Sequence, residues 1–114
     1  MDICFEGIGQ TVATFAAGKA LDPGVAVTVT GSGEVGPGGD GTPLCGVTVG
    51  AERGGAVAVQ IGGVVKVGCS GDAPEAGWRE LACDGKGGVR TDTGGMKYLV
   101  LAVDEDKKSV VVKL

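Results

Sequence analysis

Residues 96–103 read MKYLVLAV and form the most apolar stretch of the chain. After the charged residues DEDKK at 104–108, the chain closes with SVVVKL at 109–114. Both stretches have the length of a strand, and the charged run between them is typical of a solvated turn. The sequence therefore predicts two closing strands, and we expect the strand at 96–103 to be central in its sheet.

Shorter apolar stretches lie upstream, each bounded by residues that favour turns. The 24 glycines among 114 residues argue against long helices, because each interior glycine costs about 1 kcal/mol relative to alanine. Within 25–30, a period of two places Val25, Val27 and Val29 on one face. We expect further strands at residues 3–5, 11–15, 25–30, 44–49, 56–61, 64–69, 78–83 and 89–91. Many short strands at this spacing predict a single all-β domain, a small β-barrel or β-sandwich with Gly-rich loops.

Three segments have a less regular pattern. Gly62-Gly63 separates two predicted strands and favours a tight hairpin between them. Residues 31–43, GSGEVGPGGDGTP, predict a long flexible loop, since they offer little to bury. Residues 1–16 are expected to form an N-terminal arm or an edge strand.

The charge distribution excludes two kinds of partner. The net charge is −4, and the basic residues are scattered singly apart from Lys107-Lys108. Binding to phosphates or to anionic lipid needs clustered Lys and Arg, so we expect no direct nucleic-acid or membrane partner. The acidic N-terminus lacks the basic start and apolar run of a signal peptide, which predicts folding in the cytoplasm.

The residue types needed for most catalysis are missing or poorly placed. The chain has no His, which is the commonest acid–base residue and the usual activator of a Ser or Cys nucleophile. Its cysteines form no C-x-x-C pair and are expected to be reduced; they are Cys4, Cys45, Cys69 and Cys83. We therefore expect no enzyme, no cofactor and no metal, although carboxylates paired in space are invisible at this level.

Two motifs resemble known sites without their usual context. Residues 31–36 match G-x-G-x-x-G, but residues 37–41, PGGDG, cannot open the helix that a dinucleotide site requires. Lys97 follows Gly95-Met96, as in the lysine hairpin of biotinyl and lipoyl carrier domains, yet it begins an apolar strand. We expect Lys97 to point outward from that strand. Trp78, the one tryptophan, is expected to anchor the core, with an interface role as the alternative.

The chain also resembles a known family over roughly residues 10–114, and the resemblance is better in the second half. The similarity runs through AVQIGGVVKV at 58–67, SGDAP at 70–74, GW at 77–78, Leu81, DG at 84–85, GV at 88–89, LVLAVD at 99–104 and VVVKL at 110–114. This order resembles the head decoration, or cement, proteins of tailed phages and prophages. The resemblance implies a compact β-barrel or β-tulip-like body that binds the outside of the expanded capsid shell, often as a trimer, and stabilises it.

By this resemblance the partner is the major capsid protein, and the protein is found on the virion surface after assembly in the host cytoplasm. The N-terminal arm and the 31–43 loop are candidate shell contacts, and this interpretation of the arm fails if the segment is a central strand. The candidate capsid or subunit interface comprises Ile3, Phe5, Val12, Phe15, Glu34, Val35 and Trp78. Two alternatives stay open: another virion-surface module that binds carbohydrate or a host surface, and a small carrier domain.

Overall fold

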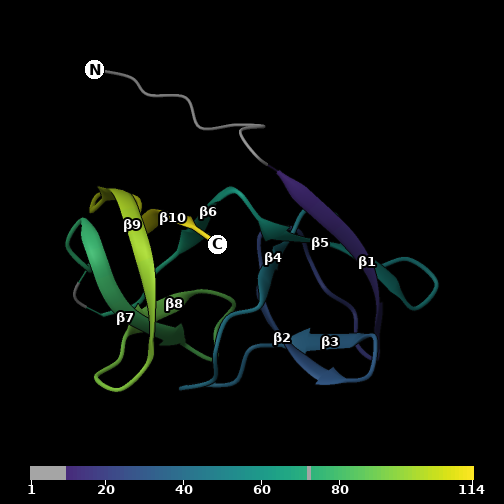
Figure 1. Cartoon of the computed structure of the whole chain (residues 1–114). Helices are drawn as coiled ribbons and strands as arrows, with labels where there is room; N and C mark the ends of the chain where they lie inside the picture. The colour runs from purple at the N-terminus through teal and green to yellow at the C-terminus, as the bar shows by residue number, and fades with distance from the viewer. Residues whose placement is uncertain (1–9, 72) are drawn as a thin grey trace.

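The two closing strands form the middle of a five-stranded antiparallel sheet, as Figure 1 shows. In the computed structural model, which describes residues 10–71 and 73–114, strand β9 (Met96–Asp104) pairs with β10 (Ser109–Lys113) and with β7 (Gly77–Cys83). The edges of this sheet are β6 (Val64–Gly68) and β8 (Val89–Thr91). We call it the second sheet, because the first half of the chain forms a separate set of strands. The prediction that 96–103 forms a central strand is confirmed.

The first half of the chain forms a closed five-stranded barrel. Its strands are β1 (Thr11–Ala17), β2 (Ala26–Gly31), β3 (Glu34–Pro37), β4 (Gly46–Thr48) and β5 (Ala56–Gly62). They follow the order β1-β3-β2-β4-β5 and close through the antiparallel pair of β1 with β5. The all-β prediction is confirmed. No helix long and apolar enough to cross a membrane occurs in the part of the chain that the structure describes.

One wall of the barrel is buried on both sides. Val27 of β2 points into the barrel, where it packs with Val35, Val57 and Val59. Its neighbour Ala26 points the other way and belongs to the core beneath the second sheet. Leu44 and Val47, from β4 and the segment before it, join Ala26 in that second core, together with Val65, Val67, Leu81, Cys83, Val89, Tyr98, Val100, Val110 and Val112. The barrel and the sheet therefore share a wall and pack as one unit.

Polar contacts fix this shared wall. The Tyr98 hydroxyl donates to the Leu44 carbonyl at 2.9 Å and accepts from the Leu44 backbone N–H at 3.2 Å. Burial raises the pKa of Tyr98, so its neutral form is kept. Further out, Arg90 Nε of β8 donates to the Asp40 carboxylate at 2.6 Å, which joins the β3–β4 connection to the sheet.

The prediction of a hairpin at Gly62-Gly63 is wrong. Strand β5 belongs to the barrel and β6 to the second sheet, and they do not pair with each other. Gln60 holds the corner instead, because its side-chain amide donates to the carbonyls of Gly62 and Val64 at 3.0 Å each. Gly63 has φ +84°, which suits the change of direction that carries the chain between the layers.

Two other expectations need correction. Residues 31–43 are not one flexible loop, because residues 34–37 form β3, which pairs with β2 and with β1. Residues 11–16 are neither an arm nor an edge, since β1 pairs with β5 along its length and with β3 near its end. The arm interpretation therefore fails for this part, and residues 1–9 lie outside the described residues.

Gly46 marks the closest approach of β4 to β5. A Cβ at this position would lie 2.5 Å from the Gln60 carbonyl oxygen and 2.6 Å from a Val59 methyl carbon. We expect Gly46→Ala to lower the free energy of unfolding by about 1–3 kcal/mol, the usual cost of overpacking. Urea denaturation measures it. Gly50→Ala is the matched control, because a Cβ there meets nothing within 4 Å. Equal stability of the two variants would contradict the packing of β4 on β5.

Asp84 holds the turn between β7 and β8. Burial by itself raises the pKa of this carboxyl group, but hydrogen bonds from the Ser70 hydroxyl and from the backbone N–H groups of Lys86 and Gly88 outweigh it. The pKa therefore lies below its usual value. A carboxylate with a lowered pKa stabilises the fold fully above its unfolded-state pKa of about 4, and this stabilisation is lost as pH falls through the folded-state pKa.

We expect the urea midpoint of the wild type to fall more steeply between about pH 5 and pH 2 than that of Asp84→Asn, which keeps the shape but does not titrate. Asp106→Asn, in the exposed turn between β9 and β10, is the control and should follow the wild type. Parallel curves for all three proteins would contradict the role of Asp84.

Candidate binding surface

The described residues contain neither a cluster of metal ligands nor an activated thiol. No three of their His, Cys, Asp or Glu side chains are placed to hold a metal ion. Cys45, Cys69 and Cys83 are free thiols, and burial raises the pKa of each. A raised pKa leaves little nucleophilic thiolate at neutral pH, so these three cysteines act as small core residues.

Trp78 lies on the surface, and the expectation that it anchors the core is wrong. Its side chain is 66% exposed, while Leu81 and Cys83 of the same strand are fully buried. Because side chains alternate along a strand, Trp78 shares the outward face of β7 with Glu80. Tyr98 takes the aromatic place in the core, where its hydroxyl finds partners on Leu44.

Trp78 begins a row of side chains that crosses four strands. Leu99 of β9 lies opposite Trp78, Lys113 of β10 lies opposite Leu99, and Val64 of β6 lies opposite Lys113. With neighbouring strands about 4.8 Å apart, the row spans about 14 Å. Leu99 and Val64 are half-buried, and Lys113 is exposed. None of the described strands covers this side of the second sheet.

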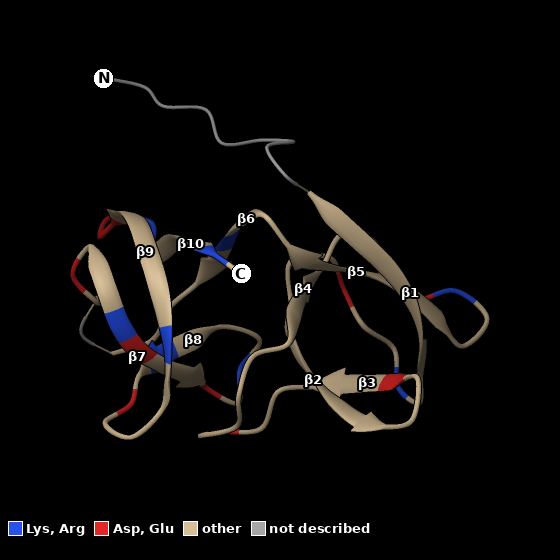
Figure 2. Cartoon of the chain, in the orientation of Figure 1, with Lys and Arg blue, Asp and Glu red and all other residues tan. Residues whose placement is uncertain are grey.

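Two more lysines flank the row. Lys97 precedes Leu99 by two residues on β9, and Lys66 follows Val64 by two residues on β6, so both point to the same side and both are exposed. Figure 2 shows basic segments on β6, β9 and β10, three of the four strands that carry the row. We call this surface the Trp78 face and define it by Trp78, Leu99, Val64, Val111, Lys66, Lys97 and Lys113.

Two acidic side chains on this side of the sheet accept hydrogen bonds from the backbone. Glu80 accepts a hydrogen bond from the backbone N–H of Gly94 at 2.9 Å, and Asp104 accepts one from that of Lys107 at 3.1 Å. The ion pairs among the described residues all involve Arg79 or Arg90, not lysine. The Trp78 face therefore combines an apolar centre with ammonium groups that pair with no described carboxylate.

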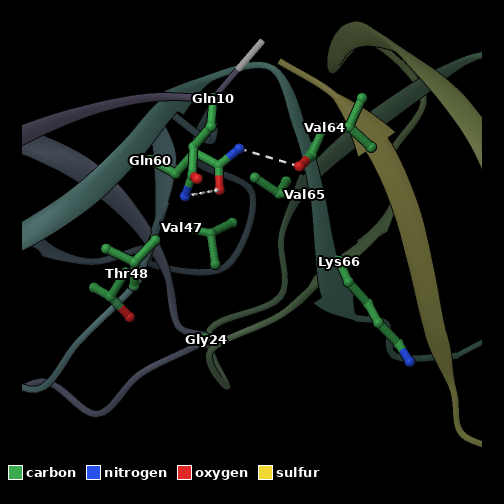
Figure 3. A pocket seen from close by; sticks show the side chains of 9 residues that line it. Gln10, Gly24, Val47, Thr48, Gln60, Val64, Val65 and Lys66 are labelled. Atoms are coloured by element: carbon green, nitrogen blue, oxygen red, sulfur yellow. Dashed lines mark hydrogen bonds between the residues drawn. The ribbon is translucent and has the colours of Figure 1, made fainter. Parts of the chain in front are cut away.

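A cavity of about 420 Å³ lies beside this face, where β6 meets the barrel. Figure 3 shows Val47, Val65 and Gln60 around it, with Lys66 extending away along β6. The amide of Gln60 is fully used, since it donates to two carbonyls and accepts from Gln10 Nε2 at 3.3 Å. The cavity thus combines apolar walls with the polar side chains of Gln10, Thr48 and Lys66.

The structure does not bring the other predicted interface residues into one patch. Val12 is exposed on β1 and Glu34 is exposed at the start of β3, both on the barrel. Phe15 packs against the barrel core, and Val35 is only 1% exposed. The inclusion of Val35 is therefore corrected, because its side chain fills the barrel. Ile3 and Phe5 lie outside the described residues.

Sequence reasoning missed Leu99, Val64 and Lys113. The signal was present in part, because Val110 and Val112 point into the core and this leaves Lys113 on the opposite face of β10. The sequence alone does not give the strand pairing register that places Lys113 in line with Leu99 and Trp78.

The two weak motifs fall on ordinary structure. The glycine motif at 31–36 covers the turn between β2 and β3 and the first residues of β3, and no helix follows it. Lys97 points outward from β9 opposite Glu80, as expected, rather than from the tip of a turn.

Neither a comparison with models of known protein families nor one with curated proteins gives a match.

The exposure of Trp78 is directly measurable, because it is the sole tryptophan. We expect the fluorescence emission maximum of the native protein to lie at a wavelength close to that of free tryptophan in water. We also expect acrylamide to quench this fluorescence almost as efficiently as it quenches free tryptophan. We expect Trp78→Phe to change the free energy of unfolding by less than about 0.5 kcal/mol. A blue-shifted emission that acrylamide does not quench would place Trp78 in the core and contradict the structure.

Proposed function

We propose that the chain is a non-enzymatic phage or prophage structural protein that binds the outside of the capsid shell and stabilises it. The observation that carries the proposal is the exposure of Trp78 on an uncovered sheet face. Tryptophan is the side chain most enriched at the energetic centre of protein interfaces. The resemblance of roughly residues 10–114 to capsid decoration proteins, which is better in the second half, supports the shell as the partner.

A rigid all-β body suits this role. Its shared wall fixes the outward side chains of the second sheet, so binding costs little ordering of the protein. Each copy needs a standard interface of about 1,200–2,000 Å² across capsid subunits. Binding only the mature shell stabilises that shell by mass action, as any ligand of one state does. By resemblance, the chain acts as a trimer on the shell and reaches it in the host cytoplasm.

The alternatives receive less support from the described residues. Sugar-binding sites present several aromatic platforms, whereas Tyr98 is in the core and Phe15 is half-buried, which leaves Trp78 as the exposed aromatic side chain among residues 10–71 and 73–114. A carrier lysine projects from a tight turn, whereas Lys97 lies on β9 opposite Glu80. We therefore favour the shell over a carbohydrate or a carrier reaction.

Counting copies on purified particles tests the proposal. Virions from the phage or prophage that encodes the chain are purified on a gradient, and its copies are counted against the major capsid protein by quantitative mass spectrometry. We expect near-stoichiometric copies. A handful of copies would indicate a tail or fibre module instead, and absence from intact particles would contradict the proposal.

A further inference from the structure

We infer that the Trp78 face binds an acidic protein surface on the shell, with the indole seated among apolar side chains and the lysines paired to the partner's carboxylates. The inference rests on the proposed function, since it names the contact through which the chain would bind. It also fixes which side of the molecule turns toward the shell.

The apolar centre supplies the anchor. Trp78 and Leu99 are directly opposed across β7 and β9, and Val111 on β10 adds a half-buried side chain to the same face. An exposed indole beside aliphatic side chains buries a large area when a partner covers it, which gives the energetic centre that interfaces require.

The lysines specify the chemistry of the partner. The chain as a whole carries −4, so its other surfaces repel an acidic partner. Lys66, Lys97 and Lys113 gather on one face, where the acids Glu80 and Asp104 each accept a backbone hydrogen bond and form no ion pair with a described lysine. Opposite charges around an apolar centre orient the complex and exclude other faces.

The same features argue against nucleic acid as the occupant. Three lysines on a protein of net charge −4 neutralise few phosphates, whereas a protein that binds DNA through its backbone typically makes about 6–10 phosphate contacts. A protein surface with a few carboxylates around an apolar hollow matches both the charge and the indole. Binding to shells that contain no DNA would show that the partner is protein and not nucleic acid.

Oxidative footprinting on such shells tests the location of the contact. Full-length protein is bound to purified, expanded, DNA-free shells and exposed to hydroxyl radicals, and oxidation is read by mass spectrometry. We expect oxidation of Trp78 to fall at least about fivefold on binding, as its interface is desolvated. Met96 is the internal control, because it is 57% exposed but pairs with the buried Leu81 on the other side of the sheet.

Matched variants test the chemistry of the contact. We expect Trp78→Ala to weaken shell binding by at least about 30-fold, as expected for an interface hot spot. Lys113→Glu should weaken it by about tenfold or more, with Lys113→Gln in between. Lys19→Glu, in the exposed segment after β1, makes the same charge change away from the face and should alter affinity less than about threefold. Equal urea midpoints confirm that each variant is folded.

The outcomes distinguish the inference from the function on which it rests. Wild-type protein that binds shells while Trp78 stays oxidised, or while Lys113→Glu and Lys19→Glu bind alike, overturns the inference and leaves the proposed function standing. Binding only to DNA-filled particles, lost after nuclease treatment, identifies nucleic acid and overturns the inference. Wild-type protein that binds no shells overturns both.

Discussion

The rest of the structure depends on the wall formed by β2, β4 and the segment before β4, which is buried on both faces. Val27 closes the barrel interior, while Ala26, Leu44 and Val47 close the core of the second sheet. Because one wall serves two cores, neither the barrel nor the sheet can tilt without opening a cavity in the other, and core cavities cost several kcal/mol. Tyr98 reinforces the wall by satisfying both backbone groups of Leu44.

This arrangement decides which surface is left for a partner. The second sheet turns its inner face to the shared wall, so its outer face, with Trp78 and Leu99, meets solvent. A cross-strand row on a hydrogen-bonded sheet keeps its spacing without help from loops, and this is the preorganisation that strong binding needs.

The local sequence pattern predicted most of the strands. Their partners in the sheets depend on residues far away in the sequence, which the local pattern does not show. The run at 96–103 had strand length and the highest apolar content, so its central position followed directly. Gly62-Gly63 had the composition of a hairpin, but the partners of β5 and β6 lie far away in sequence, and only those partners place the glycines at a corner between layers. Alternation along β7 separated Trp78 from Leu81, yet it could not tell which face the barrel covers. Ala26 shows the same limit, because the period of two that groups Val25, Val27 and Val29 leaves it on the opposite face and cannot show that the second sheet buries that face.

Electron cryomicroscopy of the decorated shell shows which side of this molecule meets the capsid. We expect the second sheet to lie against the capsid, with the Trp78 indole covered and capsid carboxylates within ion-pair distance of Lys66, Lys97 or Lys113. A reconstruction in which the barrel contacts the shell and Trp78 points to solvent would contradict it.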